Sequence, residues 1–120
     1  MVEAVKKLIP EAEITAVGTN PMATTSMLKA GATNGATGEN AVIVGARNAD
    51  IIVGPIGIAI ADSLLGEITP AMAVAIGRSS AKKVLIPVNK CNNIVVGVEQ
   101  KSTSELISEA IDKIKEISRS

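Results

Sequence analysis

Residues 50–57 read DIIVGPIG, a short apolar run that ends abruptly at glycine and proline. Three more runs have this form: EITAV at 13–17, KVLIPV at 83–88 and NIVVGV at 93–98. Segments that carry helix-capping residues lie between them. Near-continuous Val and Ile runs that alternate with helices are typical of a parallel sheet covered on both faces. We therefore predict an α/β fold, a three-layer sandwich around a mainly parallel sheet of four or five strands.

Helix signals separate the strand-like runs. Asn20 and Thr69 are N-cap residues, and each is followed by proline at the first helical position. Ser102 with Glu105 forms a capping box before a final amphipathic stretch. The predicted strands are residues 13–17, 50–54, 83–88 and 94–98, and the predicted helices are residues 2–9, 21–30, 39–47, 58–65, 70–78 and 103–117.

Two segments allow more than one interpretation. Residues 31–38 are mostly small and form a connection with room for one short strand. Residues 39–47 contain the strand-like string AVIV, yet their first residues suit a helix start, and we interpret them as a short helix. The run at 50–54 is the better strand, which supports that choice.

The composition excludes several classes of function. The 120 residues contain no Phe, Tyr, Trp or His, which rules out a His-based triad, a His-ligated metal and base stacking on aromatic rings. Twelve basic residues balance 12 acidic ones, so nothing favours nucleic acid or an anionic membrane as a partner. The single Cys91 cannot form an internal disulfide, and no signal peptide or membrane span is visible. We expect one cytoplasmic α/β domain over residues 1–120 with no metal.

Small and polar residues follow three of the predicted strands, at residues 18–20, 54–57 and 89–91. In a parallel sheet ligands bind beyond the carboxyl ends of the strands, so we predict that these three turns converge on one rim. Helix-start amides and hydroxyls can hold a phosphate or a carboxylate there, and glycine lets the backbone approach a ligand closely. The predicted ligand-binding residues are Gly18, Thr19, Asn20, Thr24, Glu39, Asn40, Gly54, Gly57, Asn89 and Lys90.

The catalytic candidates are few. Glu67 lies in apolar surroundings just before a helix start and could act as an acid or base, and Lys90 could pair with an anionic group. Capping and ordinary turn formation explain the same residues without any ligand, and a surface or capping position explains Asp62 and Glu67. No acid–base pair and no nucleophile with a base can be identified. The sequence therefore favours binding over catalysis.

Four longer strings carry a family resemblance: AVGTNPMATTSMLKAGA at 16–32, GATGEN at 35–40, GPIGIAIADSLLGEITPAMAVAIGRS at 54–79 and KVLIPVNKCNN at 83–93. Together they resemble a small family of uncharacterised bacterial proteins, common among anaerobes and classed as a domain of unknown function. The resemblance implies a Rossmann-like fold. It also implies a further strand and a glycine-rich, pyrophosphate-binding turn ahead of the first helix. This sequence starts inside that helix, so either it is truncated at its start or the domain does without that site, and we name a nucleotide only as a candidate cofactor.

Three functions remain open: an enzyme or nucleotide-binding protein, a non-catalytic sensor of a small molecule, and an oligomerising structural protein. Residues 70–76 read PAMAVAI, without the polar outer face expected of a surface helix. A second subunit could bury such a helix, so we predict a homodimer. The alternative is that the final helix covers it within one chain.

Overall fold

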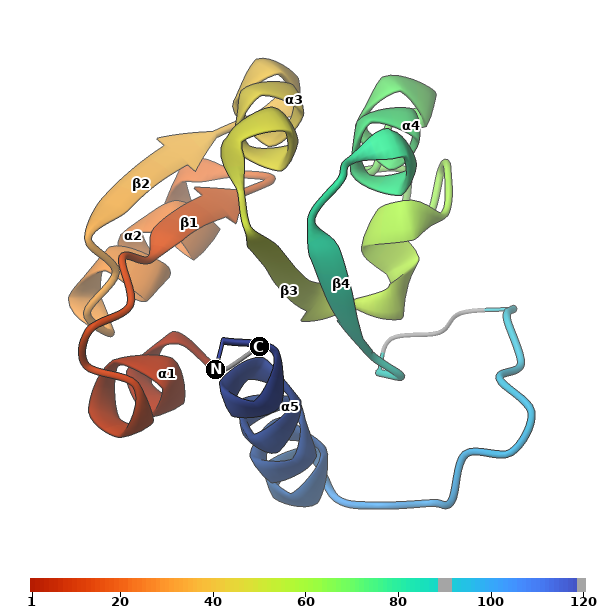
Figure 1. The fold of residues 1–120 in the computed structure, drawn as a ribbon. Helices are drawn as coiled ribbons and strands as arrows, with labels where there is room; N and C mark the ends of the chain where they lie inside the picture. Colours follow the sequence, from red (N-terminus) through yellow and green to blue (C-terminus); the bar gives the residue numbers. More distant parts are fainter. Residues whose placement is uncertain (89–91, 119–120) are drawn as a thin grey trace.

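The computed structural model describes residues 1–88 and 92–118. Helices and parallel strands alternate along most of the chain, as the sequence predicts, and Figure 1 shows their arrangement. In chain order the elements are α1 (Val2–Leu8), β1 (Thr15–Gly18), α2 (Pro21–Lys29), β2 (Asn34–Thr37), α3 (Glu39–Asn48), β3 (Ile51–Pro55), the 3-10 helix η1 (Ile56–Ala59), α4 (Pro70–Arg78), β4 (Lys82–Ile86) and α5 (Thr103–Ser118).

The strands form two parallel pairs. β1 pairs with β2, with Thr15 opposite Asn34, and β3 pairs with β4, with Ile51 opposite Lys82. The α/β class and the parallel pairing are confirmed, but the described residues do not join the pairs into the predicted sheet of four or five strands. The apolar runs predict where strands form. They do not predict which strand edges meet, because edge pairing depends on the packing of distant segments.

The predicted caps at the starts of α2, α4 and α5 are confirmed. Asn20 Oδ1 accepts the backbone N–H of the residue three positions later at 2.9 Å, and Thr69 Oγ1 does the same at 3.2 Å. In the capping box, Ser102 N–H donates to Glu105 Oε1 at 3.2 Å and Glu105 N–H donates to Ser102 Oγ at 3.2 Å. Gly31, just after α2, has φ of 114°, a left-handed value that suits glycine at a helix end.

Two predicted elements are wrong. Residues 58–65 are not a regular helix: η1 ends at Ala59, and a left-handed turn follows. The turn contains positive φ angles of 65° at Asp62, 55° at Leu64, 57° at Leu65 and 84° at Gly66. Such values end a right-handed helix, and the apolar composition gave no sign of them. Residues 94–98 also form no strand, since Val96 and Gly97 lie in a turn and Gly97 has a positive φ of 84°.

Two apolar clusters make up the core. In the first, α1 and α5 pack together through Val5, Ile9, Ile111 and Ile114 against the strands. In the second, Ile68, Met72 and Ala73 pack with side chains of α3, η1 and the left-handed turn. Within the described part of the chain, no helix has the length and apolar character needed to cross a membrane.

The prediction that α4 is buried all round holds for one face only. Met72 and Ile76 are buried by residues of the same chain, but Val74 on the other side is 48% exposed. The predicted alternative, in which the last helix covers α4, does not occur, since α5 lies against α1 and β4. The outer face of α4 is therefore open in the single chain.

Candidate functional site

The turn that follows β1 contacts the loop that precedes α4 through one carboxylate. Glu67 Oε2 accepts a hydrogen bond from Thr19 Oγ1 at 2.8 Å and a longer one from Asn20 Nδ2 at 3.5 Å. Glu67 belongs to the loop after β3 and η1, so the turn after β1 contacts that loop. The predicted convergence of residues 18–20 with residues 54–57 stays a prediction. The third predicted turn, at 89–91, lies outside the described residues.

A second carboxylate joins two helix starts. Glu39 is the first residue of α3, and its Oε1 accepts a hydrogen bond from Thr69 Oγ1 at 2.5 Å. Thr69 is also the N-cap of α4, and only one residue separates it from Glu67. Two separate sets of hydrogen bonds, joined only by the chain at residues 67–69, therefore connect the starts of α2, α3 and α4. We call Thr19, Asn20, Glu39, Glu67 and Thr69 the helix-end cluster.

The charges in the helix-end cluster are balanced without basic side chains. Among the described residues, the ion pairs are Lys101 with Glu109 and Lys113 with Glu116, which leaves Glu39 and Glu67 outside any ion pair. A helix start carries a partial positive charge because its first N–H groups lack partners within the helix. A hydroxyl group therefore contacts each carboxylate in place of a basic side chain, and the Asn20 amide also contacts Glu67.

Thr24 shapes the turn between β1 and α2. This side chain is 6% exposed, and its Oγ1 lies 3.3 Å from Asn20 O, 3.2 Å from Ala36 O and 2.8 Å from Thr37 Oγ1. The predicted ligand-binding hydroxyl of Thr24 is thus engaged inside the protein, where it links α2 to β2. Gly18 is packed against it: a Cβ at this position would lie 2.4 Å from Thr24 Oγ1.

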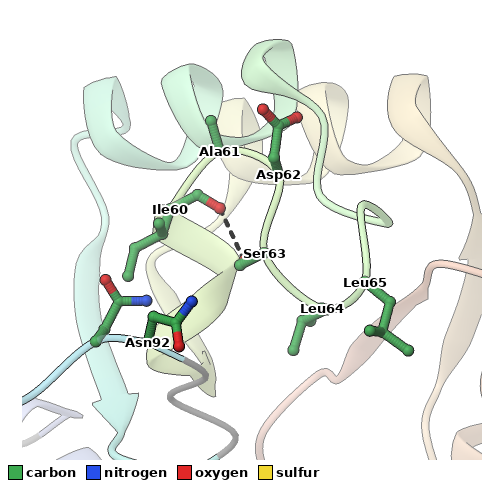
Figure 2. A pocket seen from close by; sticks show the side chains of 8 residues that line it. Ile60, Ala61, Asp62, Ser63, Leu64, Leu65 and Asn92 are labelled. Carbon is green, nitrogen blue, oxygen red and sulfur yellow. Dashed lines mark hydrogen bonds between the residues drawn. The ribbon is translucent and has the colours of Figure 1, made fainter.

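The loop after β3 closes on itself. The single O–H of Ser63 lies within hydrogen-bond distance of two carbonyl oxygens, Gly57 O and, at 2.8 Å, Ile60 O. Figure 2 shows the hollow on this side, lined by residues 60–65 together with Asn92 and Asn93. The Asp62 carboxylate points away from Asn92 in this view. The carbonyl of the predicted site residue Gly57 is therefore used within the loop, and the hollow has a mostly apolar wall.

The remaining predicted site residues lie outside the helix-end cluster. Asn40 is exposed in the first turn of α3. Gly54 packs against Ile58, whose Cδ1 would lie 2.9 Å from a Cβ at Gly54. Asn89 and Lys90 lie outside the described residues. The described chain contains no group of three or more Asp, Glu or Cys side chains arranged to hold a metal ion.

Sequence reasoning recognised Thr69 only as a helix cap and missed its bond to Glu39. Both residues lie at a helix start after a strand, and in the predicted single sheet such helices start on the same side. That placement was a usable signal, because it brings a hydroxyl at one helix start within reach of a carboxylate at another.

The comparisons with known proteins agree with the resemblance seen in the sequence. The family model described as Domain of unknown function (DUF3842) matches residues 1–119. Searches of curated proteins and of solved structures found no match to the chain. Because the family match covers almost every residue, the chain belongs to this family, a domain of unknown function.

Proposed function

We propose that the helix-end cluster binds a small anionic ligand, a carboxylate or a phosphate. The observation that carries this proposal is the placement of Glu67, whose carboxylate accepts hydrogen bonds from Thr19 and Asn20 at the start of α2. Groups that hold a carboxylate of the protein are suited to hold a carboxylate or phosphate of a ligand. The ligand oxygen would take the place of Glu67 Oε2.

The Glu67 side chain can leave this position without unfolding the loop. Glu67 is exposed, whereas the next residue, Ile68, is 2% exposed and anchored in the core. The backbone on both sides is also held, since Ile68 N–H donates to Ser63 O at 3.3 Å and Asp62 N–H donates to Ile68 O at 2.7 Å. A side-chain rotation of Glu67 is therefore enough to free the Thr19 and Asn20 donors.

The proposal includes a finer description of the fold. In it, the two strand pairs are parts of one Rossmann-like sheet, and their carboxyl ends form one rim, where a nucleotide would present a phosphate to the same donors. The protein is a binding module of the cytoplasm in this proposal.

A thermal-shift titration with inorganic phosphate, small carboxylic acids and nucleotides tests the proposal. A ligand that binds only the folded state raises the melting temperature as its concentration increases. Thr19→Ala and Asn20→Ala should each remove most of this shift. Thr25→Ala is the matched control, since Thr25 is an exposed threonine on the same helix, and it should keep the shift.

The Glu67→Gln variant gives the most specific result. Because this change removes a competing negative charge and keeps the shape of the side chain, anion binding should become tighter in the variant. Weaker binding by Glu67→Gln would mean that Glu67 contacts the ligand directly, and no shift with any anion in any variant would reject the proposed binding.

A second candidate function is self-association as a twofold dimer, which one observation favours. Large apolar side chains remain exposed in the single chain, among them Leu65 at 101%, Val74 at 48% and Val96 at 92%. A contiguous patch of such groups would mark a surface that another protein covers. Sedimentation of the whole chain at micromolar concentration tests it, and a single 12.2 kDa species would reject it.

A further inference from the structure

The loop between η1 and α4 has a strained backbone that its own hydrogen bonds hold in place. Asp62, Leu64 and Leu65 have positive φ angles of 65°, 55° and 57°, in the left-handed region that favours glycine. Glu67 N–H donates to Leu64 O at 3.2 Å, and Asp62 N–H donates to Ile68 O at 2.7 Å. Strained segments that are held in this way are common at sites that clamp a ligand. The strain marks this loop as a candidate binding surface.

The loop forms one wall of a hollow that suits a small uncharged group. The hollow has a volume of about 320 Å³, at the lower end of the range for small-molecule sites. Figure 2 shows Leu64 and Leu65 on one side of it and Ile60 with Asn92 on the other. Among its lining residues in the described part of the chain, only Asp62 carries a charge, and that carboxylate points away from Asn92. A hydrocarbon group therefore fits this hollow better than a second charged group.

Leu65 supplies apolar surface that no other part of the described chain covers. Its side chain is 101% exposed, whereas the neighbouring Leu64 packs partly against the second apolar cluster. Leu64 thus anchors the wall of the hollow, and Leu65 lies at its rim. Apolar surface that is taken out of water stabilises a complex in proportion to its area. A ligand with a hydrocarbon part would gain this stabilisation from Leu65 without any rearrangement of the core.

The hollow adjoins the helix-end cluster. Leu65 and Glu67 are separated by one residue, so their Cα atoms lie within roughly 8 Å of each other. In the proposed function, a ligand anion takes the place of the Glu67 carboxylate at the donors of Thr19 and Asn20. One small molecule can therefore contact both places, with its anionic group at these donors and its hydrocarbon part beside Leu65.

We propose that the ligand is a small amphipathic anion, an organic phosphate or carboxylate with a short hydrocarbon chain that lies in the hollow beside Leu64 and Leu65. This inference rests on the proposed anion binding at the helix-end cluster, and it names the class of the ligand. Complete burial of one methylene group raises affinity roughly fourfold. Because the hollow is open to solvent, we expect a gain of roughly twofold or more for each methylene added to the chain.

Calorimetric titration of the full chain with inorganic phosphate and with n-alkyl phosphates from methyl to hexyl tests the proposal. The affinity should increase with chain length, by roughly twofold or more per methylene. Leu65→Asn should remove this increase and keep the affinity for inorganic phosphate, since asparagine tolerates the left-handed backbone at this position. Leu8→Asn, at a leucine that is 49% exposed on α1, is the matched control and should keep the increase. The same titrations with n-alkyl carboxylates cover the second head group, and an increase in either series supports the proposal.

The outcomes separate this inference from the proposed function. If inorganic phosphate binds but the affinity does not depend on chain length in either series, the hydrocarbon site is wrong and the proposed anion binding stands. An increase that Leu65→Asn leaves unchanged would also overturn the inference, because the hydrocarbon would then lie elsewhere. Binding of no anion at all would reject both. Circular dichroism should show the same helix content in all three proteins, so that a loss of folding does not mimic the expected result.

Discussion

Replacing Gly18 by alanine should destabilise the domain through a clash in the turn between β1 and α2. An alanine Cβ at this position would lie 2.4 Å from Thr24 Oγ1, 2.8 Å from Thr24 N and 3.0 Å from Asn20 O. Two of these atoms belong to the backbone and cannot rotate away. The third belongs to a hydroxyl that already hydrogen-bonds to Ala36 O and Thr37 Oγ1. The methyl group therefore forces the start of α2 to shift.

The change in the free energy of unfolding for Gly18→Ala is the sum of three effects, one of which opposes the other two. Insertion of a methyl group into a packed site destabilises by about 1–3 kcal/mol. A lost Thr24 hydrogen bond adds about 1 kcal/mol. The reduced freedom of the unfolded chain offsets about 0.4–1 kcal/mol of this loss. The net loss for Gly18→Ala is about 2 kcal/mol, which lowers the melting temperature by roughly 8 °C in a domain of this size.

Two other glycines provide the controls. At Gly77, in α4, a Cβ would meet nothing within 4 Å, so alanine should stabilise the helix by about 0.5–1 kcal/mol. At Gly38 the space is equally free but φ is 100°, so Gly38→Ala should destabilise by about 1 kcal/mol through backbone strain alone. Urea unfolding followed by circular dichroism measures all three. If Gly18→Ala were as stable as Gly77→Ala, the close packing of the turn against Thr24 would be refuted.

Other substitutions test the remaining contacts by the same unfolding assay. Thr69→Ala should lose about 1–2 kcal/mol because it removes both the cap of α4 and the bond to Glu39, while Thr69→Ser should keep most of both. Ile111→Ala should lose about 2–5 kcal/mol, since this side chain is 2% exposed, and an equal effect at fully exposed Leu65 would contradict the assigned core. The pKa of Glu105 lies below its ordinary value because the carboxylate accepts hydrogen bonds from the N–H and hydroxyl of Ser102. The stabilisation of the folded state by the charged Glu105 carboxylate is therefore present at neutral pH and is lost as the pH falls through the carboxylate range. The Glu105→Gln variant should thus lose less stability in acid than the original protein. An identical pH profile for the two proteins would argue against the capping box.

Local features of the fold could be predicted from the sequence because they depend on neighbouring residues. The caps at Asn20 and Thr69 and the capping box before α5 need only a side chain and an amide a few positions away. The predicted strand 83–88 continues two residues past the end of β4 at Ile86, although the missing N–H group of Pro87 was a local signal for that end. The left-handed turn at residues 62–66 had no such signal, since two of its positive φ angles belong to leucines.

Long-range features were harder to predict for a physical reason. The apolar runs alone do not determine whether β1 and β3 pair, because both edges are chemically suited to strand pairing and tertiary packing decides. The bond between Glu67 and Thr19 joins residues 48 positions apart, so no local pattern announces it. Its general location could still be predicted, because a parallel fold gathers the turns after its strands on one side.

The helix-end cluster connects the stability of the fold with the proposed binding. The donors of Thr19 and Asn20 are already occupied by Glu67, so an anion that replaces it gains only the difference between the two sets of hydrogen bonds. The displaced Glu67 carboxylate then returns to water, where solvation offsets part of the free energy of the two hydrogen bonds that it loses. Selective binding therefore requires a ligand that makes further contacts, and the nearby helix starts of α3 and α4 are the groups of this cluster that can supply them. A ligand with several oxygen atoms, such as a phosphate ester or a dicarboxylate, is therefore favoured over a simple monovalent anion.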